Sequence, residues 1–312
     1  MSMKTAIIFP GQGSQYIGMG RDFYENFEVS KQIFNKASDI LNMDICKLCF
    51  EPNDLLNITE YTQVAMTTTC IAMYEALKEQ ECKWDVAAGL SLGEYSALYA
   101  CGAFDLKDVL MCVRKRGIYM QEEVPLGEGS MSAVIGLDNN IIEDVCKNTD
   151  GVVSIANYNC PGQIVITGEK EAVKEAGAAL LREGALRVVP LVVSGPFHSS
   201  MLKGAGKKLE VVLNNILWKK LQKPYVANVN AQYISDITKV KDLLVSQVSS
   251  SVKWQQSVQQ MINQGVDEFI EIGPGKTLKK FIKKISKKVT IYNIETINDL
   301  WDWEKCKNET ND

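Results

Sequence analysis

DVAAGLSLGEYSALYA, residues 85–100, is the stretch of sequence that decides the fold class. The apolar run DVAAGL (85–90) predicts a short buried strand, and the residues from Gly93 onward predict a helix. Between them, Gly89, Ser91 and Gly93 form a Gly-x-Ser-x-Gly turn. Small glycines allow such a turn to be tight, so that it exposes the serine hydroxyl at the start of a helix. The motif alone also occurs as a structural turn, and its place between a strand and a helix favours Ser91 as a nucleophile.

The remainder of the chain repeats this order of strand, turn and helix. KTAIIF (4–9) predicts a buried strand that ends in the loop FPGQGSQ (9–15). Helical patterns follow over 20–50 and 62–81, and further strands are expected near 224–229 and 267–272. This alternation predicts an α/β-hydrolase-like large domain with a mainly parallel sheet, formed by residues 1–126 and 194–312.

The segment 127–193 has a different order of elements, β-α-β-β-α-β, which is typical of a ferredoxin-like fold. We therefore expect it to be a small domain inserted into the large one. Its expected strands and helices are MSAVIGL (131–137), NNIIEDVCKN (139–148), VVSIANYN (152–159), QIVITGE (163–169), EAVKEAGAALLREG (171–184) and LRVVPLVV (186–193).

The bulk composition excludes several classes of protein. A net charge of -4 over 312 residues argues against a dedicated nucleic-acid binder. No run of about 18 apolar residues predicts a membrane-spanning helix, and the N-terminus lacks the pattern of a signal peptide. The nine cysteines are odd in number and scattered, as expected of reduced core thiols in a cytoplasmic protein.

Cys46 and Cys49 form the one Cys-x-x-Cys pattern of the chain. A zinc site would need two more ligands, and His198 is the only histidine and lies far away in sequence. The pair falls in a mostly apolar helical stretch, which favours a structural role. No metal or cofactor is therefore expected.

A serine nucleophile needs a base, and His198 is the only histidine that could serve. It follows a predicted strand and the turn Gly195–Pro196, which would place it at the rim of an α/β fold. A lone histidine is more often a surface or core residue, but the elbow upstream favours the catalytic interpretation of His198.

Arg116 is a charged residue on the apolar face of a predicted helix (105–123). A guanidinium on such a face needs a partner. Either a buried Asp or Glu, or the carboxylate of a substrate held in bidentate fashion, would provide one, and the residues alone leave both open. The apolar stripe that contains it consists of Leu106, Val109, Leu110, Val113 and Met120.

Several motifs in the same order resemble the malonyl-CoA:acyl-carrier-protein transacylase family over nearly the whole chain. The matching segments are FPGQGSQ (9–15), GLSLGEYSAL (89–98), RKRGIYMQ (114–121), NYNCPGQIVITG (157–168), GPFHSSML (195–202), QVSSSVKW (247–254) and EIGPGKTL (271–278). One departure is Leu90, where the family commonly has a histidine directly before the nucleophile.

The resemblance implies roles for individual residues. Ser91 would carry the acyl group, His198 would act as general base and acid, and Arg116 would bind the malonyl carboxylate. The backbone N–H groups of Gln12 and Leu92 would form the oxyanion hole.

Two further positions complete the implied site. Gln247 would orient the histidine through its main-chain carbonyl rather than through an acidic side chain. Phe197, next to the histidine, would narrow the pocket around the malonyl α-carbon and disfavour branched acyl groups.

The resemblance also implies the reaction and its partners. The malonyl group would pass from malonyl-CoA to the phosphopantetheine thiol of acyl carrier protein, through a malonyl-serine intermediate, to supply fatty acid synthesis. We expect a monomer that binds neither nucleic acid nor membrane. The family's carrier protein is strongly acidic, so a ridge of lysines on the enzyme could steer its binding. The ordinary explanation of such a lysine cluster is a solvated helix face. The lysines are Lys279, Lys280, Lys283, Lys284, Lys287 and Lys288.

Three alternatives share part of this evidence. A serine esterase or thioesterase would follow the order Ser, acid, His, and Asp138, Asp144 and Asp150 lie between Ser91 and His198 but in the small domain. A free-standing acyltransferase of a polyketide synthase would share every motif. A non-catalytic module that binds a carrier protein would not need the nucleophile, the base and the arginine.

Overall fold

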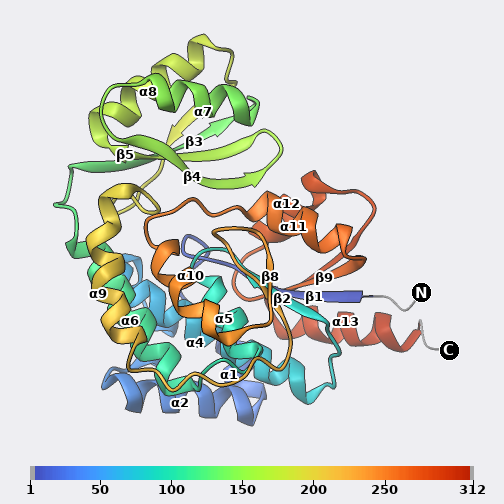
Figure 1. Cartoon of the computed structure of the whole chain (residues 1–312). Helices are drawn as coiled ribbons and strands as arrows, with labels where there is room; N and C mark the ends of the chain where they lie inside the picture. Colours follow the sequence, from blue (N-terminus) through green and yellow to red (C-terminus); the bar gives the residue numbers. More distant parts are fainter. Residues whose placement is uncertain (1–3, 310–312) are drawn as a thin grey trace.

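The computed structural model describes residues 4–309 and contains two separate sheets (Figure 1). The larger sheet has six strands, and all neighbouring pairs are parallel except the last, which is antiparallel. Their order across the sheet is β10 (Thr290–Ile294), β9 (Val266–Ile272), β1 (Lys4–Phe9), β2 (Val86–Gly89), β7 (Tyr225–Val226) and β8 (Tyr233–Ile234).

Strand β1 shows how this sheet is buried on both faces. Ile7 and Phe9 pack into one core with α4 (Thr59–Glu79), whereas Ala6 and Ile8 pack into another with α11 (Trp254–Asn263) and α12 (Thr277–Ile285). A strand covered on both sides has no need of polar alternation, which explains the continuous apolar run of its sequence.

The other helices around this sheet are mostly those that the sequence predicts. The helical pattern over 20–50 is divided in three, because Phe27 is extended (φ -122°) and Asn42 is left-handed (φ 47°). The strand expected near 224–229 has only two residues. The additional helices are α1 (Arg21–Asn26), α2 (Glu28–Leu41), α3 (Ile45–Phe50), α5 (Gly93–Ala100), α6 (Leu106–Glu122), α9 (Lys203–Leu213), α10 (Val240–Gln247) and α13 (Ile297–Glu309).

The small sheet is antiparallel throughout, with strand order β4-β5-β3-β6. Two helices pack against it around a core of their own. The last strand is shorter than the expected 186–193. Its elements, in chain order, are β3 (Gly129–Ile135), α7 (Asn139–Asn148), β4 (Val153–Cys160), β5 (Gln163–Glu169), α8 (Lys170–Arg182) and β6 (Arg187–Pro190).

The predicted fold class is therefore confirmed: an α/β fold with a largely parallel sheet and a βαββαβ insertion. The small sheet lies within residues 127–193. Residues 1–3 and 310–312 of the expected large domain lie outside the described residues. Within residues 4–309, no helix is both long and apolar enough to cross a membrane.

The edge strand β4 is hydrogen-bonded to the segment that follows α10. The Val252 N–H donates to the Ala156 carbonyl (2.8 Å), and the Tyr158 N–H donates to the Val252 carbonyl (2.9 Å). These main-chain bonds hold the edge of the small sheet against the chain segment between α10 and α11, beside Asn157, which lines the pocket described next.

Candidate active site

Ser91 lies in a sharp turn between β2 and α5, with a left-handed backbone conformation (φ 52°). The glycines of the motif are required by close contacts rather than by flexibility. A Cβ on Gly89 would lie 2.0 Å from the Gly93 carbonyl carbon, and one on Gly93 would lie 2.1 Å from the Phe9 carbonyl oxygen. A Cβ on Gly11 would similarly lie 2.4 Å from the Leu90 carbonyl oxygen. The opening loop therefore packs directly on the elbow.

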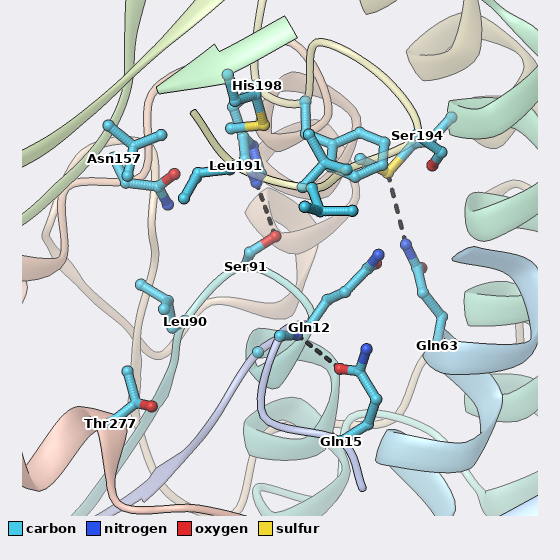
Figure 2. Close-up of a pocket in the computed structure, with 18 of the residues that line it drawn as sticks. Gln12, Gln15, Gln63, Leu90, Ser91, Asn157, Leu191, Ser194, His198 and Thr277 are labelled. Carbon is cyan, nitrogen blue, oxygen red and sulfur yellow. Dashed lines mark hydrogen bonds between the residues drawn. The ribbon is translucent and has the colours of Figure 1, made fainter. Parts of the chain in front are cut away.

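The hydroxyl of Ser91 meets the imidazole of His198, from the loop before α9 (Figure 2). Ser91 Oγ lies 2.7 Å from His198 Nε2, and His198 Nδ1 lies 2.8 Å from the Gln247 main-chain carbonyl oxygen. A carbonyl only accepts hydrogen bonds, so Nδ1 carries the proton and the lone pair of Nε2 faces the serine hydroxyl. This is the tautomer that a general base needs.

The environment of His198 favours the neutral imidazole. The side chain is only 4% exposed. Burial, and secondly the positive charge of Arg116, lower the pKa of His198 from its ordinary 6.5 to about 4. His198 is therefore unprotonated, and able to accept a proton, at any pH well above 4.

The Arg116 side chain extends from α6 to the hydroxyl of Ser91. Its Nη2 donates to Ser91 Oγ (3.1 Å) and to Gln247 Oε1 (3.0 Å), and its Nε–H has no acceptor among residues 4–309. The side chain is 1% exposed, and no ion pair between it and an acidic side chain forms in the described chain. A buried, permanently charged group without an anionic partner is costly unless a ligand provides the anion.

Gln247 connects these groups through both its side chain and its main chain. Besides the bonds to His198 and Arg116, its Nε2 donates to the Ser91 carbonyl (2.9 Å) and to Glu94 Oε2 (2.6 Å). Glu94 is fully buried, and burial raises its pKa to about 7, although hydrogen bonds from Gln247 and the Asn228 N–H oppose the shift. Glu94 and Asn228 could not be identified from the sequence, because neither position has a pattern that distinguishes it from ordinary polar residues.

Two backbone N–H groups near Ser91 have no acceptor among the described residues. Those of Gln12 and Leu92 donate to no atom in the part of the chain that the structure describes. Leu92 is the first residue after Ser91, at the N-terminus of α5. The Gln12 side chain is held by Thr59 Oγ1 (3.3 Å), which also lies 2.7 Å from Ser194 Oγ.

The site opens into a cavity of about 740 Å³ between the two sheets. Gln12, Leu90 and Thr277 line it from the large sheet side, and Asn157 from the small sheet (Figure 2). Phe197 lies on the wall next to His198. Gln63 of α4, also missed, lines the cavity with an unpartnered Oε1, and its Nε2 contacts the Met120 sulfur.

The lysine ridge is only partly helical. Lys280, Lys283 and Lys284 are exposed on α12, and Lys279 is half-buried. Lys287 and Lys288 do not share a helix face with the other four lysines, because α12 ends at Ile285 and the next residue, Ser286, is extended. None of these six lysines forms an ion pair within residues 4–309. Two other residues of α12, Thr277 and Phe281, line the cavity.

Cys46 and Cys49 both lie in α3 as free thiols, and Cys49 is buried. Burial raises the pKa of the Cys49 thiol to about 12. In the described chain, no three His, Cys, Asp or Glu side chains gather where they could hold a metal ion.

A serine–histidine pair at an elbow of an α/β fold, facing a buried arginine, fits an acyltransferase, and residues 6–304 match the acyl transferase domain model. The chain is 42% identical over 301 residues to the malonyl CoA-acyl carrier protein transacylase of Bacillus subtilis strain 168, with 94% of this chain and 95% of the relative covered. The chain belongs to this transacylase family.

Solved structures agree with this assignment. The transacylase of Clostridium perfringens superposes with a TM-score of 0.96 at 43% identity, with 99% of this chain and 98% of that chain covered. A second structure, PlMCAT:AntF, is described as a type II polyketide acyl-carrier protein in complex with its malonyl-transacylase. It matches with a TM-score of 0.95 at 39% identity, covering 97% of this chain and 99% of that chain.

Proposed function

We propose that this enzyme transfers a malonyl group from malonyl-CoA to the phosphopantetheine thiol of acyl carrier protein, through an ester on Ser91, and so supplies fatty acid synthesis. The observation that carries the choice of acyl group is Arg116. Its guanidinium is buried, forms no direct ion pair with an acidic side chain among the described residues, although the charge of Glu94 acts on it, and lies 3.1 Å from Ser91 Oγ. A malonyl carboxylate would provide the missing anion in a bidentate contact.

The first half-reaction follows from the hydrogen bonds of the site. Ser91 Oγ attacks the thioester carbonyl carbon, and its proton passes to His198 Nε2. The oxyanion that forms accepts hydrogen bonds from the free backbone N–H groups of Gln12 and Leu92. When the C–S bond breaks, His198 returns the proton to the sulfur of coenzyme A, which leaves as a thiol.

The second half-reaction is the reverse with a different thiol. The phosphopantetheine thiol gives its proton to His198 and attacks the ester carbonyl carbon. The bond between the acyl carbon and Ser91 Oγ breaks, and His198 protonates that oxygen. Because a thioester is an activated donor, a main-chain carbonyl behind the histidine is sufficient in place of an aspartate. The reaction needs no cofactor.

The bound malonyl group would also change the basicity of His198. The positive charge of Arg116 is the second cause of the low pKa of His198. A carboxylate that neutralises this charge raises the basicity of His198 when the correct substrate is present. Phe197, on the cavity wall, would restrict substituents on the malonyl α-carbon.

The cavity lies between residues 127–193 and the remainder of the chain, which we propose are two domains with the boundaries given above. The exposed lysines of α12 stand beside this cavity and fit an acidic carrier protein. We place the reaction in the cytoplasm, where both substrates would be present.

A steady-state experiment tests the transfer. Malonyl-CoA and holo-acyl carrier protein are varied together, and malonyl carrier protein is measured. Parallel double-reciprocal lines are expected of a covalent intermediate, whereas intersecting lines would reject the Ser91 ester as an obligatory step. Rapid hydrolysis of malonyl-CoA without a carrier would instead indicate a thioesterase.

A further inference from the structure

The nucleophile is held by a side chain outside its own motif. Asn228 follows β7 and is fully buried. Its Oδ1 accepts the Ser91 N–H (2.7 Å), and its Nδ2 donates to the Gly89 carbonyl (2.7 Å). The chemistry fixes the orientation of the amide, because the Ser91 N–H can only donate and the Gly89 carbonyl can only accept.

These two contacts continue the ladder between β2 and β7. The register pairs Ala87 with Tyr225 and Ala88 with Val226. Continued by two residues, it places Asn228 opposite Leu90. In a parallel ladder the residue opposite Leu90 would bond to the carbonyl of the preceding residue and to the N–H of the following one. Those are the two groups that the carboxamide of Asn228 contacts.

The main chain of Asn228 is engaged elsewhere. Its N–H donates to Glu94 Oε2 (3.2 Å), and its carbonyl accepts the Lys253 N–H (2.9 Å). The main chain has thus turned away from β2, and the side-chain amide replaces the absent peptide group. Without it, the buried Gly89 carbonyl and the part-buried Ser91 N–H would lose their hydrogen-bond partner at the point where the chain turns.

The turn itself needs such support. Ser91 has a φ of 52°, a region that residues other than glycine rarely occupy. A strained conformation persists only where the surroundings determine it. The Ser91 hydroxyl is used by His198 and Arg116, so it cannot stabilise its own turn.

We propose that Asn228 is a positioning residue for Ser91: its carboxamide acts as a strand peptide opposite Leu90 and holds the elbow so that Oγ meets His198. By bonding the Ser91 N–H it also removes that group from the oxyanion site and leaves the donor role to the next residue, Leu92. This inference rests on the proposed use of Ser91 as the nucleophile.

The amide has one substitute whose fit depends on pH. A protonated carboxyl group has one O–H donor and one C=O acceptor, as the amide face does, whereas a carboxylate has only acceptors and would repel the Gly89 carbonyl. Asn228→Asp should therefore support the elbow only while it is protonated, and burial raises the pKa of such a carboxyl group. Asn228→Ala cannot support the elbow at any pH.

Other groups near Asn228 titrate or carry charge in the wild type and in the variants alike. The malonyl-loading rate of each variant is therefore divided by the wild-type rate at the same pH. His198 remains a neutral base over the range used, because its pKa is about 4. Glu94 titrates within that range, since its pKa is about 7. Asn228 contacts Glu94 on α5 and the main chain of Lys253 before α11. Its partners Ser91 and Glu94 interact in turn with Arg116 on α6, His198 before α9 and Tyr225 on β7.

The experiment measures the single-turnover rate of malonyl loading from malonyl-CoA at about pH 5.5, 7 and 8.5. We expect Asn228→Ala to load about 100-fold more slowly at every pH, with the half-saturating malonyl-CoA concentration little changed. Asn228→Asp should be as slow at the highest pH and recover most of this loss at the lowest. The matched control is Asn230→Asp, on an exposed residue two positions along, which should load at the wild-type rate.

Two results would overturn the proposal: Asn228→Ala loading at the wild-type rate, or a ratio of Asn228→Asp to wild type that does not change with pH. If Asn228→Ala does not fold, the pH dependence of Asn228→Asp alone decides. A fluorophosphonate that labels active serines is used in parallel. If it labels wild-type Ser91 while malonyl-CoA does not, the proposed function fails, and the labelling rates of the variants still test Asn228.

Discussion

Replacing Arg116 by alanine should convert the enzyme from one that prefers malonyl-CoA into one that no longer distinguishes it from acetyl-CoA. The guanidinium has two kinds of contact in the structure. Those to Ser91 Oγ and Gln247 Oε1 serve every substrate. A contact to the terminal carboxylate would serve malonyl alone, because acetyl lacks that group.

The ratio of the two rates isolates the carboxylate contact. A hydrogen bond to a charged group is worth about 1.5–3 kcal/mol, or roughly one to two decades in rate. In Arg116→Ala the malonyl carboxylate would also enter a buried site unpaired, which adds to the loss. We expect kcat/KM for malonyl-CoA to fall about 100-fold or more relative to acetyl-CoA. Acetyl transfer loses less, since removing the positive charge also raises the basicity of His198.

The assay is kcat/KM for both thioesters with wild type, Arg116→Ala and Arg116→Lys, with folding checked by circular dichroism. Arg116→Lys should be intermediate, because a point charge cannot reproduce the planar fork. An equal loss for both substrates in a folded variant would refute the reasoning. Arg116 would then stabilise Ser91 and Gln247 only, and the selectivity would arise elsewhere in the cavity.

Three further predictions concern His198 and the lysines of α12. Because the pKa of His198 is about 4, the acid limb of kcat/KM against pH should lie near 4 to 5, and a limb near 6.5 would contradict the burial argument. The pKa of His198 is lower in the folded protein than in the unfolded one. The free energy of unfolding therefore contains its full contribution from the neutral imidazole above about pH 6.5, and this contribution is lost as the pH falls toward 4. His198→Asn should therefore gain stability relative to wild type on acidification, measured by urea unfolding at about pH 7 and 4.5, and a constant difference would be inconsistent with this. Changing Lys280, Lys283 and Lys284 to Glu should slow transfer to carrier protein at low salt and leave loading from malonyl-CoA nearly unchanged; equal effects on both half-reactions would reject α12 as the docking ridge.

The fold class could be predicted because the patterns that encode it are local. A buried strand followed by the turn around Ser91, and the alternation within 127–193, depend on neighbours in the chain. The short β7 and the break at Asn42 could not be predicted, since both depend on packing and on single backbone conformations. The end of α12 was missed for the same reason, because lysines continue past the residue where the helix stops.

The sequence could propose candidate site residues where a residue type is chemically rare. One histidine, one serine elbow and one arginine on an apolar stripe left few choices. The supporting residues are different. Glu94 and Asn228 are ordinary polar residues in the sequence, and their contacts with the candidate site depend on burial and on a register between β2 and β7 that only the three-dimensional structure shows. Leu90, the departure from the family pattern, lines the cavity and leaves the contact between Ser91 and His198 intact.

The most direct test of the account is intact-protein mass spectrometry after mixing the enzyme with malonyl-CoA. The wild-type chain should gain one malonyl group, which peptide mapping places on Ser91, and should lose it when holo-acyl carrier protein is added. Ser91→Ala should gain none. An adduct that persists in Ser91→Ala, or that maps to a cysteine, would contradict the central claim that Ser91 carries the malonyl group.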